Sequence, residues 1–158
     1  RCRSQPGCKF LMKVILQRVT EAQVVVKNEL KGQIGVGYLI LVGFTGEDDQ
    51  DVVKWMADKI TSLRVFNDEE GKKNRSLDDV GGSVLVVSQF TLYGDTRKGR
   101  RPSFLNALGG AEARVLYDHF IKCLCDLLTV ERVATGEFGA MMDVSIENQG
   151  PFTLVLER

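Results

Sequence analysis

The chain has 158 residues, of which 44% are hydrophobic and 27% charged, values typical of one globular domain able to bury a sizeable core. Its 21 basic and 21 acidic side chains cancel, which excludes a general attraction to polyanions, so nucleic-acid binding would need a local basic patch. Neither Cys2 with Cys8 nor Cys123 with Cys125 has the spacing of a zinc site or redox motif, and we predict no metal and no cofactor.

Residues 1–11 have mixed charge and no apolar run long enough for a signal peptide or a membrane span. We predict that they form a disordered leader and that the domain spans 12–158. From Met12 onward, short runs rich in β-branched residues alternate with turn formers, a pattern typical of strands. Three early strands are predicted, at 13–19, 22–27 and 38–44.

Two amphipathic helices are predicted. The first is opened by Gly46-Glu-Asp-Asp49, because acidic side chains suit the first turn of a helix. Its apolar residues recur at helical spacing, at Val52, Met56, Ile60 and Leu63. Trp55 flanks this stripe and is predicted to belong to the core. The second helix is predicted at 111–128, with an apolar face of Leu116, Phe120, Leu124 and Leu127.

Between the helices, a short strand at 63–66 and a polar segment at 67–79 lead into a central strand predicted at 84–92. Four consecutive aliphatic residues indicate a strand buried on both faces. The apolar run ends on Ser88, Gln89 and Thr91, which either cap backbone groups or converge as a site at the end of the strand. The following loop is basic, and it is either a solvated turn or a phosphate contact: Arg97, Lys98, Arg100 and Arg101.

The last part of the chain completes the predicted fold. His119, the only histidine, falls on the flank of the second helix, and we interpret it as a solvated side chain rather than a catalytic base. Three further strands are predicted at 130–135, 141–147 and 152–157, the last two joined by a hairpin turn at Gly150-Pro151. This order of elements predicts one compact α/β domain in α/β/β layers, with mixed β-sheets and two helices packed on one side.

Two sequence motifs point to a family. Ser88-Gln-Phe-Thr-Leu92, followed by Arg97-Lys-Gly-Arg-Arg-Pro-Ser-Phe104, and Asn148-Gln-Gly-Pro-Phe-Thr153 resemble the signature motifs of the D-aminoacyl-tRNA deacylases, also called D-tyrosyl-tRNA deacylases. Supporting matches lie at 17–22, 81–87 and 138–142, and the resemblance extends from Met12 to the end of the chain.

The resemblance implies a cytoplasmic enzyme that hydrolyses the ester between a D-amino acid, or glycine, and the 3′-terminal adenosine of tRNA. It also implies a homodimer with an active site at each subunit boundary. There, Gly150 and Pro151 of one protomer, joined by a cis peptide bond, are expected to enter the partner's pocket and exclude L side chains. Arg18 matches the family arginine that helps to fix this motif across the interface.

The same resemblance assigns residues to the pocket. Its floor is expected to consist of Ser88, Gln89, Phe90 and Thr91. The terminal adenosine is expected to be held by Phe138, Gly139, Ala140 and Met142. The basic residues at 97–101 are then expected to contact phosphates of the acceptor stem, which positions the tRNA without reading its sequence. Two residues depart from the family pattern, because Phe152 stands where many members have valine and Lys73 replaces an apolar residue.

The chemistry predicted from these residues is hydrolysis by water. An ester needs mainly an oriented nucleophile and a stabilised oxyanion, and no Ser-His-Asp or Cys-His arrangement can be assembled near the motifs. We favour the backbone N–H groups of Phe90 and Thr91 as the oxyanion site, with the terminal 2′-hydroxyl of the tRNA assisting, over Thr91 as the nucleophile. Two alternatives remain, a related deacylase with a trans Gly-Pro bond that clears L-aminoacyl-tRNA and a nucleic-acid-binding module without hydrolysis.

Overall fold

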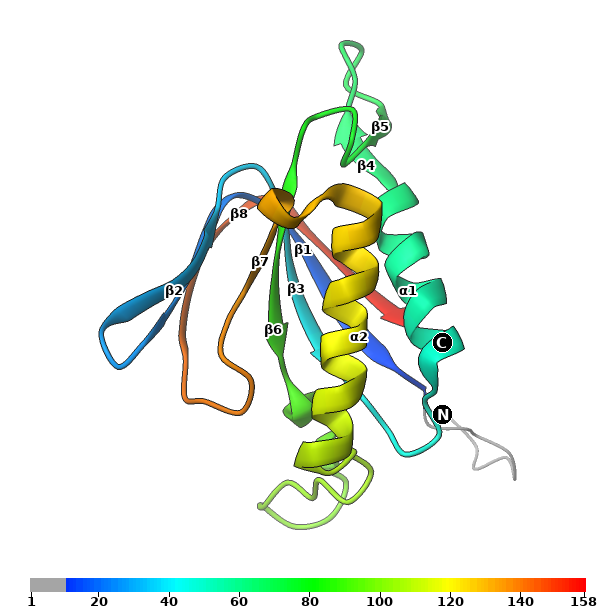
Figure 1. Ribbon diagram of the computed structural model, residues 1–158, viewed down its shortest axis with the longest axis vertical. Helices are drawn as coiled ribbons and strands as arrows, with labels where there is room; N and C mark the ends of the chain where they lie inside the picture. Colours follow the sequence, from blue (N-terminus) through cyan, green and yellow to red (C-terminus); the bar gives the residue numbers. More distant parts are fainter. Residues whose placement is uncertain (1–10) are drawn as a thin grey trace.

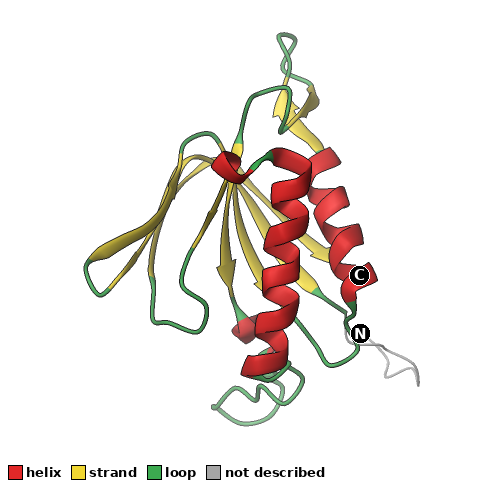
Figure 2. Ribbon diagram, viewed as in Figure 1, coloured by secondary structure: helices red, strands yellow, loops and turns green. Residues whose placement is uncertain are grey.

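The computed structural model describes residues 11–158 and contains a large mixed sheet, a two-stranded sheet and two helices (Figures 1 and 2). The strands are β1 (Lys13–Val26), β2 (Glu29–Ile34), β3 (Gly37–Gly43), β4 (Arg64–Asn67), β5 (Lys73–Ser76), β6 (Ser83–Ser88), β7 (Val133–Thr135) and β8 (Asp143–Glu157). The helices are α1 (Gln50–Ser62) and α2 (Gly110–Leu128), with 3₁₀ turns η1 (Phe90–Tyr93) and η2 (Val130–Arg132). The leader predicted at 1–11 lies, apart from Leu11, outside the described residues.

The large sheet is organised around β1, which spans 14 residues. Its first half pairs with β3 and its second half with β2, both antiparallel, while β8 pairs with it on the other side. The strands predicted at 13–19 and 22–27 are therefore one strand, because the chain passes from one partner to the next without a turn. Prediction also missed β2, where only Gly32 and Ile34 are buried and the apolar pattern is correspondingly weak.

The centre of the sheet is β6, which pairs in parallel with β3 on one side and with β7 on the other. Residues 84–87 of β6 are buried, which confirms the prediction of a strand covered on both faces. The strand ends at Ser88 rather than at 92, because the chain then turns into η1. The predicted strand at 130–135 is likewise shorter, since its first residues form η2.

Both helices pack on one face of the large sheet and against each other (Figure 1), as the sequence predicts. Asp49 caps α1 by accepting a hydrogen bond from the Val52 N–H at 2.9 Å. The core between helices and sheet contains Val53, Met56 and Ile60 of α1 and Leu116, Tyr117, Phe120 and Leu124 of α2. Within residues 11–158, neither helix is long and apolar enough to cross a membrane.

Two core predictions on the helices are wrong. Trp55 is 37% exposed, and its ring lies under the guanidinium of Arg158 at 4.7 Å rather than inside the core. Leu127 is 43% exposed, whereas Leu128 is buried in its place. In both helices, the buried face lies slightly to one side of the predicted apolar face, because helical periodicity alone does not fix which flank of a helix the sheet covers.

The C-terminal strand β8 differs from prediction in its continuity. The strands expected at 141–147 and 152–157 form one edge strand that remains paired with β1, so Gly150-Pro151 is not a hairpin turn. Asn148 pairs with Val19 and Thr153 with Gln17, so residues 149–152 bulge out opposite one residue of β1. The Gly150-Pro151 peptide bond is cis.

A small hairpin, β4 with β5, extends from the body of the molecule (Figure 1). The strand predicted at 63–66 is confirmed as β4, but β5 lies in the segment interpreted as a polar loop, because three of its four residues are exposed. Asp68 closes the turn, as its carboxylate accepts hydrogen bonds from the backbone N–H groups of Glu70 and Lys72.

Asp48, in the loop before α1, makes stability depend on pH. Burial raises its pKa to about 6, although one carboxylate oxygen accepts a hydrogen bond from Thr45 N–H at 2.8 Å. Because the folded pKa exceeds the unfolded one, the folded state binds the proton more tightly, so the stabilisation is full below about pH 4 and is lost as the pH rises through about 6.

The side chain of Asp48→Asn keeps an acceptor oxygen but cannot ionise. The free energy of unfolding of this variant, relative to that of the parent, is therefore expected to be about 2 kcal/mol higher at pH 7 than at pH 4. Urea unfolding at both pH values measures the difference. The exposed Asp51→Asn serves as the control, and an equal effect of Asp48→Asn at both pH values would contradict the assignment.

Candidate active site

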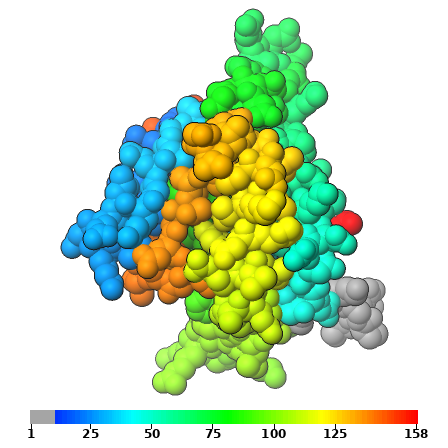
Figure 3. Space-filling model, viewed as in Figure 1, coloured from blue at the N-terminus to red at the C-terminus, as the bar shows by residue number. Residues whose placement is uncertain are grey.

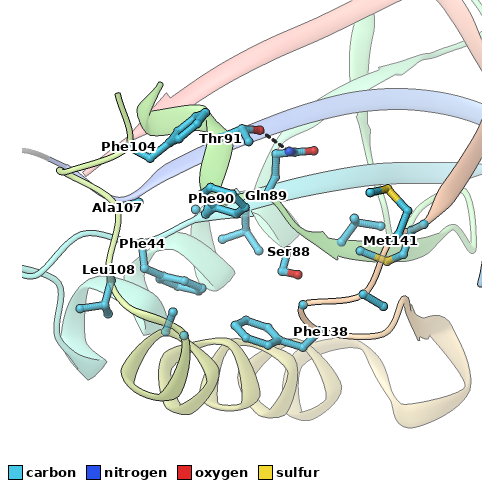
Figure 4. A pocket seen from close by; sticks show the side chains of 18 of the residues that line it. Phe44, Ser88, Gln89, Phe90, Thr91, Phe104, Ala107, Leu108, Phe138 and Met141 are labelled. Carbon is cyan, nitrogen blue, oxygen red and sulfur yellow. Dashed lines mark hydrogen bonds between the residues drawn. The ribbon is translucent and has the colours of Figure 1, made fainter. Parts of the chain in front are cut away.

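A pocket of about 760 Å³ opens where the parallel strands β3 and β6 end together (Figure 4), and its volume is in the range of small-molecule sites. One side is formed by the end of β6 and by η1, at Ser88, Gln89, Phe90 and Thr91. The opposite side is formed by the loop between β7 and β8, at Phe138, Gly139, Ala140, Met141 and Met142. The structure thus brings together the two groups of residues that the sequence assigns to the pocket floor and to the adenosine.

The floor is set by the way the chain leaves β6. Gln89 N–H donates to the Val42 carbonyl at 2.7 Å, which extends the pairing with β3 by one residue before the chain turns. Gly43 makes this turn possible, because a Cβ there would lie 2.9 Å from the Gln89 carbonyl oxygen and 3.0 Å from the Tyr93 ring. Phe90 and Thr91 therefore line the pocket in the η1 turn rather than continuing the sheet.

The Thr91 hydroxyl has an amide partner rather than a base. The side-chain amide of Gln89 donates a hydrogen bond to it (Figure 4), and among the described residues this is the only hydrogen bond of that hydroxyl. A threonine attacks an ester efficiently only if a neighbouring group accepts its proton. Within the described part of the chain, the arrangement therefore provides an oriented polar group and not an activated nucleophile.

The opposite wall is anchored to the sheet through α2. Tyr117 donates a hydrogen bond to the Val86 carbonyl of β6 at 3.0 Å, and burial raises its pKa to about 12, so the donor stays protonated. The Phe138 ring packs on Tyr117 at 5.3 Å between centroids and lies 5.5 Å from the Arg114 guanidinium. Gly139 follows with φ +75°, a left-handed conformation that suits glycine.

The remaining candidates for general base or metal ligand lie elsewhere. His119 is half-buried on the flank of α2, with Nε2 3.6 Å from the Cys123 sulfur, and it does not line the pocket. Burial raises the pKa of the Cys123 and Cys125 thiols, which keeps them protonated. Within residues 11–158, no three His, Cys, Asp or Glu side chains are grouped so as to hold a metal ion.

Arg18, Gly150 and Pro151 do not line the pocket of their own chain. Arg18 is 7% exposed and donates through Nε and Nη2 to the Gln149 carbonyl, at 3.2 and 3.1 Å, and through Nη1 to the Val65 carbonyl at 2.6 Å. Its guanidinium also lies 4.8 Å from the centre of the Phe152 ring. Within one chain, Arg18 therefore holds the start of the exposed Gly150-Pro151 bulge.

The basic loop at 97–101 is exposed beside the pocket, but its cations are not equivalent. Arg97 makes a salt bridge with Asp95 at 2.5 Å, and this hydrogen-bonded pairing holds the pKa of Asp95 well below its usual range. Lys98, Arg100 and Arg101 make no salt bridge with the described residues.

Sequence reasoning missed the apolar part of the pocket. Phe44 and Leu108 both line it, and Leu108 N–H donates to the Phe44 carbonyl at 2.9 Å, which ties the end of the basic loop to the end of β3. Met141 also lines the pocket and is 91% exposed. The available signal was the position of large apolar residues at the borders of predicted elements. Phe44 ends the strand predicted at 38–44, Met141 begins the one predicted at 141–147, and Leu108 precedes the helix predicted at 111–128.

Residues 15–157 match the family described as D-Tyr-tRNA(Tyr) deacylase. The chain belongs to this family. A D-aminoacyl-tRNA deacylase of Chloroherpeton thalassium is 55% identical over 146 residues, which cover 92% of this chain and 95% of the relative. One of an Exiguobacterium species is 55% identical over 148 residues, covering 93% and 99%.

Two solved structures have the same fold. One, described as a c-Myc DNA unwinding element binding protein, matches with a TM-score of 0.87 at 41% identity, covering 92% of this chain and 98% of the other. The other, described as a probable eukaryotic D-amino acid tRNA deacylase, has a TM-score of 0.82 at 20% identity, covering 94% and 100%, and shows the fold alone. The predicted family and fold class are confirmed, and this deacylase is a hydrolase that acts on aminoacyl-tRNA.

Gly43→Ala is expected to lower the deacylation rate at least tenfold, because its Cβ would displace the Gln89 carbonyl or the Tyr93 ring and so shift the backbone at 90–91. Deacylation of D-Tyr-tRNA and the melting temperature are measured together. Gly46→Ala is the matched control, since its Cβ meets nothing within 4 Å. Parent-like rates in Gly43→Ala would contradict the role given to this turn.

Proposed function

We propose that this deacylase hydrolyses D-aminoacyl-tRNA, and glycine mischarged on tRNA, by attack of water on the ester in the pocket at the end of β6. The proposal is carried by one observation, that residues Ser88–Thr91 and the Phe138–Met142 loop line two sides of a single pocket (Figure 4). The loop would hold the terminal adenosine, and its 3′-ester would then reach the floor. Aminoacylation of tRNA with the wrong amino acid would supply this substrate in the cytoplasm, and its hydrolysis would keep that amino acid out of translation.

The oxyanion site is formed by main-chain groups. Phe90 and Thr91 begin the η1 turn, and the first N–H groups of a helical turn have no acceptor within it. In the proposed step, the water oxygen bonds to the ester carbonyl carbon, and the resulting oxyanion accepts hydrogen bonds from these N–H groups. The bond from that carbon to O3′ then breaks, O3′ takes up the proton lost by the water with help from the 2′-hydroxyl, and the free amino acid and tRNA result.

Selectivity is proposed to come from a second copy of the chain. The Gly150-Pro151 bulge lies opposite Arg18 of β1, which pairs with Tyr38 of β3 in the same chain. The pocket begins at Val42, which is four residues further along β3, or about 13 Å away at the usual rise of a strand. The bulge of the same chain therefore does not enter its own pocket. In a homodimer, the main chain at Gly150 and Pro151 of the partner would occupy the space of an L side chain and leave the D side chain and glycine unhindered.

The surface of β8 supports such a dimer. This edge strand exposes three apolar side chains, Val144 at 37%, Ile146 at 37% and Val155 at 63%. Edge strands that expose apolar residues favour association, and burying this strand would carry the Gly150-Pro151 bulge into the interface with it.

The basic loop is proposed to contact phosphates of the acceptor stem. With Arg97 already paired to Asp95, the contact would be made chiefly by Lys98, Arg100 and Arg101. Phosphate contacts do not read sequence, which suits an enzyme that must accept many tRNAs.

A second candidate function is nucleic-acid binding without hydrolysis. It is favoured by the structural relative described as a DNA unwinding element binding protein, at 41% identity. Salt titrations of DNA and RNA binding beside a deacylation assay separate the two, since a binding module would retain affinity for DNA and leave D-Tyr-tRNA intact.

The proposed exclusion predicts that D-Tyr-, D-Asp- and Gly-tRNA are hydrolysed and that L-Tyr-tRNA is cleaved at least a hundredfold more slowly than D-Tyr-tRNA.

Arg18→Met is expected to reduce the D-to-L ratio about tenfold, because the Gln149 carbonyl loses both of its hydrogen bonds to the guanidinium. Single-turnover deacylation of each substrate gives the ratios.

Arg132→Met is the matched control for Arg18→Met. Its guanidinium also binds backbone carbonyls, those of Gly82 and Leu77, but far from the bulge in sequence. Both variants are expected to lose stability, and only Arg18→Met should change the ratio. Comparable cleavage of L-Tyr-tRNA by the parent would refute exclusion altogether.

Hydrolysis by water predicts that Thr91→Ala lowers kcat by at most about tenfold, since the hydroxyl orients but does not attack. Rapid-quench kinetics and mass spectrometry of the quenched enzyme test this. An acyl group trapped on Thr91, or abolished turnover with intact substrate binding, would show instead that Thr91 is the nucleophile.

A further inference from the structure

Two phenylalanine side chains at the mouth of the pocket are unusually exposed. Phe90 is 58% exposed and Phe104 is 37% exposed, and their rings meet edge to face with centroids 5.2 Å apart (Figure 4). The burial of aromatic rings is a large source of folding energy, so two rings left together at a pocket mouth suggest a ligand with a flat apolar face.

The backbone around Phe104 is held in place on both sides. Before it, Asp95 and Ser103 exchange two backbone hydrogen bonds, of 2.8 and 2.9 Å, which close the base of the basic loop. After it, Ala107 N–H donates to the Phe104 carbonyl at 3.0 Å. Its ring lies over Gly94, where an added Cβ would come within 3.1 Å of a ring carbon. The ring is therefore presented by a fixed backbone.

The charges near this pair indicate the direction in which a nucleic acid would leave the pocket. The cations Lys98, Arg100 and Arg101 belong to the loop that Asp95 and Ser103 close, immediately before Phe104. That segment projects from the lower end of the molecule, below α2 (Figure 3). If the terminal adenosine lies against the 138–142 loop, the phosphates that precede it run toward these cations and pass the phenylalanine pair.

We propose that Phe104, with Phe90 beside it, is a stacking platform for the base immediately 5′ of the terminal adenosine. The proposal rests on the adenosine site proposed above and extends it by one nucleotide. A base at the single-stranded end of a tRNA is free to stack on an aromatic ring, and such stacking tolerates any base because every base has a π-face. The platform supplies affinity for the unpaired end, while the loop cations bind its phosphates.

The experiment compares three non-hydrolysable ligands that carry D-tyrosine as a 3′-amide: adenosine alone, adenosine preceded by cytidine, and adenosine preceded by an abasic nucleotide. The abasic ligand keeps the added phosphate and lacks the base. The parent enzyme is expected to bind the ligand with cytidine about tenfold more tightly than the ligand with the abasic nucleotide, which is within the range for stacking of one base. Equilibrium dissociation constants are measured by calorimetry at one salt concentration.

Phe104→Leu is expected to reduce this cytidine-to-abasic ratio to about twofold or less, because an aliphatic side chain offers no π-face. Phe104→Tyr is expected to keep the ratio. Leu105→Ala is the matched control, since Leu105 is the next residue, is 93% exposed and is not aromatic, and it should leave the ratio unchanged.

If the parent binds the adenosine ligand but does not distinguish the cytidine ligand from the abasic one, the stacking platform is refuted and the proposed adenosine site is retained. Failure of all three ligands to bind would contradict the adenosine site and the platform together. Sedimentation of each variant adds a further check, because a Phe104→Leu protein that keeps the ratio but changes its oligomeric state would assign the pair to a subunit contact instead.

Discussion

The parallel pairing of β3 with β6 is the constraint on which the site depends. It brings two strand ends to one edge of the sheet, where Val42 accepts the last hydrogen bond of the ladder from Gln89. Beyond that bond the chain turns, and the pocket begins where the pairing stops. On the helical side, β6 is also held by Tyr117 of α2, whose hydroxyl donates a hydrogen bond to the Val86 carbonyl. Both walls of the pocket are thus positioned by contacts with β6.

The chemistry available at this edge is that of the main chain. Within the described residues, the Thr91 hydroxyl is bonded to an amide, His119 lies on a helix flank outside the pocket and the α2 thiols stay protonated. An ester is already activated, and backbone donors fixed in the η1 turn at the end of β6 need little reorganisation when an oxyanion forms. In the proposed mechanism, the fold therefore contributes mainly by positioning the ester and the backbone donors, and less by supplying acid–base groups.

The sequence predicts the fold where apolar patterns are strong and fails where tertiary pairing decides. The buried run at 84–87 and the helices were predictable, but β1 and β8 were each divided, because nothing local reveals that a strand changes partner or bulges. The pocket residues at 88–91 and 138–142 were found through the family motifs. That Arg18 holds the Gln149 carbonyl of its own chain could not be predicted, since the two residues are 131 positions apart.

The bulge of β8 has a mechanical consequence. Its ends are registered against Val19 and Gln17, its first carbonyl is held by Arg18, and Asn148 accepts a hydrogen bond from Phe152 N–H at 2.7 Å across it. The bulge, which in the proposed dimer would exclude L side chains, is therefore expected to move only with the sheet edge that carries it. In the proposed dimer, unfolding of this sheet edge would remove selectivity and hydrolysis together. Loss of selectivity alone would require a change in the contacts that hold the bulge, such as those of Arg18.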